Sequence, residues 1–125
     1  MEVLKQCVAI GVAGFFGALA RFGVAAGCGR LFQKTSFPVG TFVINITGSL
    51  FLGWFLASVG TRINISDVTR LAIATGFVGA YTTFSTFMYE SDKLIQDGQW
   101  NMAAANLVAS VAVGLFAVRL GAKLA

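Results

Sequence analysis

Four long apolar stretches, separated by short charged connectors, constrain this chain more than any other feature. They cover residues 8–29, 37–60, 71–89 and 98–118, and Arg21 is the only charged residue within them. A helix that crosses a membrane needs about 20 consecutive apolar residues. The spacing therefore predicts four membrane spans joined by charged connectors.

The composition excludes a soluble domain. Hydrophobic residues make up 57% of the chain and charged residues only 11%, whereas a soluble domain carries about 25% charged residues. Four such helices in succession would leave no polar face for water. We expect an all-α integral membrane protein with one four-helix transmembrane domain over residues 1–125, with spans near residues 5–29, 38–60, 67–92 and 98–121.

The basic residues carry topology information rather than a nucleic-acid surface, because they lie at helix ends and form no stripe. Four spans place both termini and the second connector on one side of the membrane. That side holds five basic residues and the other holds three, or four if Arg21 is included: Lys5, Arg62, Arg70, Arg119 and Lys123, against Arg30, Lys34 and Lys93. Such a weak bias specifies orientation poorly. Two oppositely inserted copies could therefore pair about an axis in the membrane plane.

The third stretch differs from a lipid-facing helix because it is rich in glycine and hydroxyl residues. Residues 76–87 read GFVGAYTTFSTF. Glycine weakens a helix, and Thr and Ser side chains compete for its backbone bonds. Irregular backbone at membrane depth survives where it is buried in protein or lines an aqueous cavity, and freed carbonyls there often bind ions. We expect a mid-membrane break, although an unbroken helix with back-bonded hydroxyls is the alternative.

Two phenylalanines in this stretch could face an anion. Phe84 and Phe87 fall on one helical face, with the hydroxyls of Ser85 and Thr86 beside them. Aromatic rings are electropositive at their edges, so two phenyl edges and hydroxyl donors could surround a small anion. Plain packing explains such a pair equally simply, and the residues alone leave both interpretations open.

Polar residues in the other spans suggest a track through the bundle. Asn45 lies in the middle of the second span, and Ser110 lies one turn from Asn106 in the fourth. Each needs a helix partner or a wet path, since an unpaired polar group in lipid is costly. Arg21 either extends to the nearer interface or shapes an anion vestibule. Glu90, near the membrane boundary, is either a mouth residue or simply solvated.

Three segments of the chain resemble the Fluc (CrcB) fluoride channel family. They are GFFGALARF at residues 14–22, GTFVIN at residues 40–45 and, most specific, GFVGAYTTFSTF at residues 76–87. The resemblance implies a dual-topology antiparallel homodimer with two fluoride pathways. It also implies passive export of fluoride across the inner (cytoplasmic) membrane, with the lipid bilayer and a second copy of the chain as partners.

The resemblance also assigns roles to individual residues. It matches Phe84 and Phe87 to an aromatic box beside the pathways, and Asn45 to the pore asparagine. The remaining pathway matches are a hydroxyl track and an acidic residue near the pore mouth: Ser85, Thr86 and Ser110, and Glu90 respectively.

A structural sodium ion is implied in the same way. Gly79 and Thr82 match broken-helix positions whose backbone carbonyls hold sodium at the dimer interface, with four oxygens coming from two subunits. Tyr81 departs from the small or aliphatic residues common at its position in the family. Its main chain would be unaffected, so the departure leaves the sodium assignment in place.

Other function classes fit less well. A small proton-coupled multidrug transporter needs a carboxylate deep in the membrane, and Glu2 and Glu90 lie outside or at the edge of the spans. An assembly subunit would leave the hydroxyl and phenylalanine cluster unexplained. With no histidine and no acid pair within a span, we predict no enzymatic activity.

Overall fold

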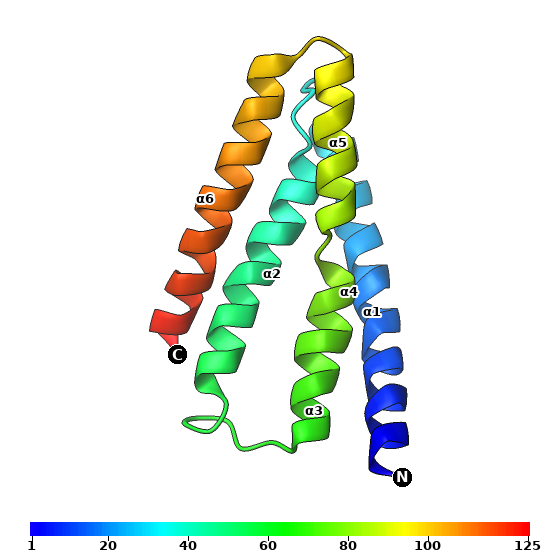
Figure 1. The fold of residues 1–125 in the computed structure, drawn as a ribbon, viewed down its shortest axis with the longest axis vertical. Helices are drawn as coiled ribbons and strands as arrows, with labels where there is room; N and C mark the ends of the chain where they lie inside the picture. Colours follow the sequence, from blue (N-terminus) through cyan, green and yellow to red (C-terminus); the bar gives the residue numbers. More distant parts are fainter.

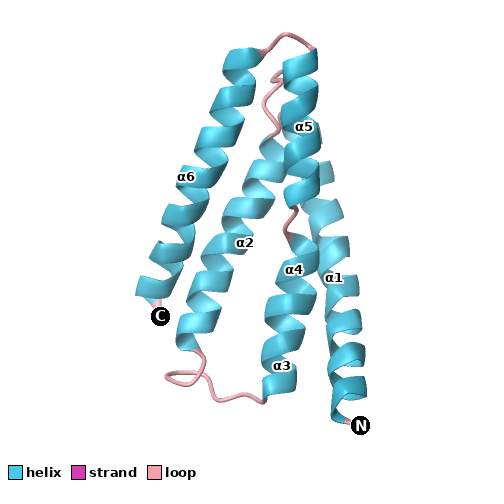
Figure 2. Cartoon of the chain, viewed as in Figure 1, coloured by secondary structure: helices cyan, strands magenta, loops and turns pink.

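The computed structural model describes all 125 residues, and its regular secondary structure is entirely helical (Figure 2). Four helical segments are long and apolar enough to cross a membrane. This confirms the all-α prediction with four membrane-length helices. In chain order the elements are α1 (Glu2–Leu31), α2 (Val39–Ser58), α3 (Asp67–Leu71), the π-helix η1 (Ala72–Val78), α4 (Gly79–Tyr81), α5 (Phe84–Gln96) and α6 (Trp100–Leu124).

The helices run up and down the long axis of the molecule, with both termini at one end (Figure 1). The loop between α2 and α3 lies at that same end, and the two other connections lie at the opposite end. Helix α6 packs along α2, and α1 packs chiefly against η1 and α4. Helix α2 lies between α6 and the third span, so it can present residues to both.

The third span is interrupted, as the sequence predicts. Helix α3 starts at Ser66, whose hydroxyl accepts a bond from the Thr69 N–H, and the helical path runs through η1 to Tyr81. Thr82 and Thr83 are extended, with ψ of 159° and 115°. Gly79 itself is helical, with φ of −61° and ψ of −37°. The break therefore lies at the paired threonines rather than at the glycines.

The outer surface of the bundle suits lipid rather than water. Only 17 of the 125 residues are buried, while large apolar side chains project outward along α1 and α6. They include Phe15, Phe22, Val111 and Phe116, each more than half exposed. With the hydropathy of the four spans, this surface indicates a multi-pass membrane protein.

Glycines allow two pairs of helices to approach backbone to backbone. A Cβ added at Gly53 in α2 would collide with the carbonyl oxygen of Val118 in α6, and one at Gly121 would collide with that of Leu50. In the other pair, Gly17 lies in the same way against Phe77. Because lipid removes the hydrophobic drive between helices, such close contacts supply much of the association.

We predict that Gly53→Ala destabilises the fold by about 1–3 kcal/mol, because overpacking against a carbonyl forces the helices apart. Thermal unfolding in detergent, followed by circular dichroism, measures the effect. Gly27→Ala is the matched control, since a Cβ there meets nothing within 4 Å. Equal stability of the two variants would refute the packing role of Gly53.

Candidate functional site

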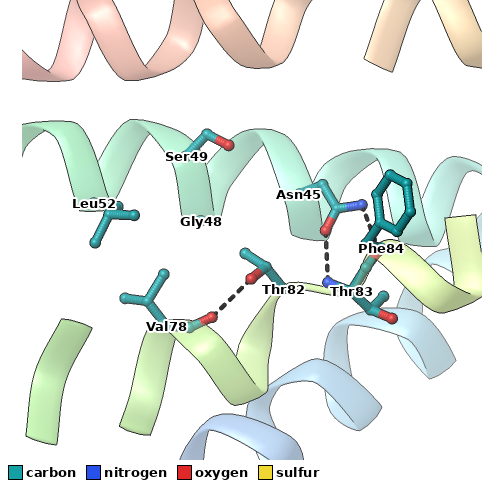
Figure 3. Close-up of a pocket in the computed structure, with 8 residues that line it drawn as sticks. All are labelled: Asn45, Gly48, Ser49, Leu52, Val78, Thr82, Thr83 and Phe84. Atoms are coloured by element: carbon teal, nitrogen blue, oxygen red, sulfur yellow. Dashed lines mark hydrogen bonds between the residues drawn. The ribbon is translucent and has the colours of Figure 1, made fainter. Parts of the chain in front are cut away.

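The break in the third span is held by the side chain of Asn45. The Asn45 Nδ2 donates to the Thr83 carbonyl at 3.0 Å, and the Thr83 N–H donates to Asn45 Oδ1 at 2.8 Å. Figure 3 shows both bonds, which run from α2 to the extended residue between α4 and α5. One amide side chain thus pairs both backbone groups of Thr83.

Asn45 therefore replaces the helix's own bonding at this point. In an unbroken helix the Thr83 N–H would bond to the carbonyl of Gly79. Instead it bonds to Asn45, so the Gly79 carbonyl loses its helical donor, and the Thr82 carbonyl, outside the helices, accepts no backbone N–H. Gly79 is exposed and Thr82 is half-buried. The break thus leaves two carbonyl oxygens without their helical partners.

A cluster of hydroxyl groups starts the helix beyond the break. The Thr83 hydroxyl caps α5 by accepting from the Thr86 N–H, and it donates to Thr86 Oγ1 at 3.0 Å. Ser85 Oγ lies 3.4 Å from the Thr83 hydroxyl. Because Thr86 accepts from Thr83, its own O–H hydrogen is available to another group. Thr83 is a site residue that sequence reasoning left without a role of its own.

Phe84 and Phe87 meet at the start of α5. Their ring centroids lie 6.0 Å apart with an interplanar angle of 67°, an edge-to-face arrangement. Phe87 is 6% exposed and Phe84 is 73% exposed. The sequence predicts that they share one helical face, and the structure brings the two rings into contact. The Phe87 ring is buried within the bundle, whereas the Phe84 ring lies on its surface.

A hollow of about 250 Å³ opens beside the break, between α2 and the third span (Figure 3). Four of its lining residues are polar and lie at mid-span: Asn45, Ser49, Thr82 and Thr83. Phe84 forms part of its wall. The hollow is therefore lined by four polar side chains and by an exposed aromatic ring.

A series of side-chain hydrogen bonds joins α6 to α5. Ser110 Oγ donates to Asn106 Oδ1 at 3.2 Å, Asn106 Nδ2 donates to Ser91 Oγ at 2.9 Å, and Ser91 Oγ donates to the Phe87 carbonyl at 2.8 Å. Asn106 and Ser91 are 1% and 3% exposed. This series of bonds ends at the backbone carbonyl of Phe87. Ser91 was missed in the sequence because a lone serine near the end of a span carries no motif.

Two charged residues expected near a pathway do not line the hollow beside the break. Glu90 borders a separate hollow with Ser36 and Lys93, and its Oε2 is buried without a hydrogen-bond partner. Arg21 is half-buried on α1 and forms no ion pair. The structure thus brings Asn45, the hydroxyl residues at 85 and 86 and the two phenylalanines together, with Ser110 linked through Asn106.

Fold and site together define a class of protein. Several membrane spans, one of them interrupted by an ordered break with free carbonyls, are typical of proteins that conduct or transport ions.

Comparison with known proteins gives the family. The family model described as CrcB-like protein, Camphor Resistance (CrcB), matches residues 8–122. This chain belongs to that family.

Its relatives carry a consistent name. A protein of Chloroflexus aurantiacus is 40% identical over 121 residues, covering 97% of this chain and 95% of the relative. Relatives from Acidobacterium capsulatum and Maridesulfovibrio salexigens are 43% and 46% identical, covering 90% and 78% of this chain and 89% and 77% of the relatives. All three are named fluoride-specific ion channel FluC, which describes a channel and not an enzyme.

We predict that Asn45→Ala lowers stability by about 1–3 kcal/mol for each Thr83 backbone group left unpaired. Thermal unfolding of the purified protein measures the loss. Asn101→Ala serves as the control, because Asn101 is exposed and makes no side-chain hydrogen bond. An Asn45→Ala protein as stable as the control would contradict the bonding described here.

Proposed function

We propose that this protein is a fluoride-selective channel that lets fluoride leave the cell passively across the cytoplasmic membrane. The observation that carries the proposal is the polar break in the third span, in a chain whose relatives are named fluoride-specific channels. Two copies inserted in opposite directions form the working unit, with two pathways.

The groups at the break suit a small, strongly hydrated anion. To enter the protein, fluoride must exchange water for strong donors in a narrow space. Thr86 has a free hydroxyl hydrogen, and Asn45 retains its second amide hydrogen after bonding to Thr83. Phenyl edges add positive potential. Ser85, exposed beside them, supplies a further hydroxyl.

Ser110, the remaining hydroxyl residue expected on the pathway, directs its hydroxyl group toward Asn106. Ser110 donates its only hydroxyl hydrogen to Asn106. To act as a donor to fluoride, Ser110 would have to rotate away from Asn106. Rotation of one hydroxyl is a small cost, and it would let the ion pass from one donor to the next.

Sodium is proposed to bind at the free carbonyls of the break. Unwound backbone in transporters coordinates sodium through such oxygens. The Gly79 carbonyl has lost its helical donor to Asn45, and the Thr82 carbonyl accepts no backbone N–H. One copy offers too few oxygens to enclose the ion. Gly79 is exposed, so a second copy packed at the break could complete the ligand set.

Pairing of two copies has independent support from the surface at the break. Phe84 is 73% exposed, and it borders the hollow that is lined by four polar residues. Polar groups in a membrane need protein or water over them. A second break placed against the first would cover these groups, and the weak charge bias of the connectors permits the opposite orientation.

The multidrug-transporter alternative lacks support. Its proton exchange needs a carboxylate deep in the membrane. Glu90, near the end of the third span, is the nearest acidic residue to the break, and the relatives are named as fluoride channels.

Efflux from proteoliposomes tests the function directly. Vesicles loaded with potassium fluoride should release fluoride to an external electrode once a potassium ionophore is added. Vesicles loaded with chloride should release far less, because the larger anion fits the donors poorly. Equal fluoride and chloride efflux would overturn the proposed selectivity.

The aromatic pair gives a second prediction. Phe84→Ile and Phe87→Ile should each reduce fluoride efflux by about tenfold, the factor that corresponds to one aromatic contact of about 1.4 kcal/mol. Phe116→Ile is the control, since that ring projects outward from α6. Efflux at the control level from both variants would remove the rings from the pathway.

A further inference from the structure

Tyr81 makes a contact across the bundle that its position alone does not require. It is the last residue of α4, directly before the break. Its hydroxyl lies 2.8 Å from the Thr47 hydroxyl of α2. Its ring stacks on Phe77, with centroids 6.2 Å apart and planes 8° from parallel.

The direction of the Tyr81–Thr47 bond follows from the second bond that Thr47 makes. Thr47 Oγ1 donates its hydrogen to the Val43 carbonyl at 2.7 Å. A threonine hydroxyl has one hydrogen, so the Tyr81 hydroxyl is the donor to Thr47. The tyrosine hydrogen is thereby used within the protein, which excludes Tyr81 as an anion donor in this arrangement.

Three consecutive residues of the third span, Tyr81 to Thr83, contact one turn of α2. Tyr81 bonds to Thr47, and the Tyr81 ring and the Thr82 methyl lie over Gly48, where an added Cβ would collide with the methyl. Thr83 bonds to Asn45. Hydrogen bonds at Tyr81 and at Thr83 thus hold the end of α4 and the start of the break against α2.

We infer that the Tyr81 hydroxyl and Thr47 are positioning residues for the carbonyl oxygens of residues 79–82. The inference rests on the proposed sodium site for its functional consequence. Asn45 holds the chain at Thr83, directly after this segment, and Tyr81 holds the segment itself by tying the last turn of α4 to α2. Without the Tyr81 contact, α4 can tilt and the oxygens lose their common orientation.

Removal of the hydroxyl alone tests this. Tyr81→Phe keeps the ring and its stacking, and Thr47→Val keeps the shape of the threonine. Each should raise the sodium concentration that supports half-maximal fluoride efflux by about two- to tenfold, the range for one net hydrogen bond. The double variant should match either single variant, because both remove the same bond. Thr47→Ser, which keeps the hydroxyl, should behave like the unmodified chain.

Two controls separate positioning from general loss of hydroxyl groups. Tyr89→Phe removes an exposed tyrosine hydroxyl on α5 that makes no hydrogen bond. Thr61→Val removes a threonine in the loop after α2, whose hydroxyl bonds to carbonyls at the end of α2 and to no other helix. Neither should shift the sodium dependence. An unchanged sodium dependence in both Tyr81→Phe and Thr47→Val would overturn the inference.

A second readout distinguishes this inference from the sodium proposal. Amide hydrogen exchange at residues 82–84, measured by nuclear magnetic resonance in detergent, should be faster in Tyr81→Phe than in Tyr89→Phe. If efflux from the unmodified chain is independent of sodium, the sodium site is wrong, and this exchange rate still decides whether Tyr81 holds the break. Equal exchange in the two variants would refute the positioning role.

Discussion

The exchange of hydrogen bonds at Thr83 is the interaction on which the site depends. A backbone break inside a membrane is costly because lipid supplies no partners for the freed groups. Asn45 meets both backbone groups of Thr83 from a neighbouring helix. The carbonyl groups freed before the break attract cations, while hydroxyls and phenyl edges a few residues further along suit a small anion. The side chain of Asn45 thus stabilises an interruption of the helix inside the membrane.

The rest of the bundle holds α2 in position for that task. Gly53 of α2 and Gly121 of α6 let these two helices approach to backbone contact. Another side of α2 carries Asn45, Thr47 and Gly48 toward the third span. Helix α1 packs against η1 and α4, the segment before the break. The part of the third span that precedes the break is therefore packed on two sides, while Phe84 remains exposed.

Much of this can be predicted from the sequence, for reasons that differ between features. The spans follow from the apolar stretches, since lipid imposes length and polarity directly. The break follows from the segment rich in glycine and hydroxyl residues, but its exact position does not. Both kinds of residue weaken the helix, yet Gly79 is helical, and the extended residues are Thr82 and Thr83. The partner of Asn45 lies 38 residues away, and local patterns contain no information on such pairings. The buried Ser91–Asn106 bond was hidden for the same reason. Fluoride itself is indicated by the motif at residues 76–87 and by the names of relatives, since hydroxyls and phenyl edges suit several small anions.

We propose that the break held by Asn45, rather than the apolar helices around it, creates the fluoride pathway. A variant that combines Asn45→Leu with Thr83→Ala removes both the clamp and the cap of α5, so nothing remains to stabilise the interruption. Fluoride efflux from vesicles that contain equal amounts of inserted protein measures the result. Efflux should fall to the level of protein-free vesicles. Efflux equal to that of the unmodified chain would contradict it.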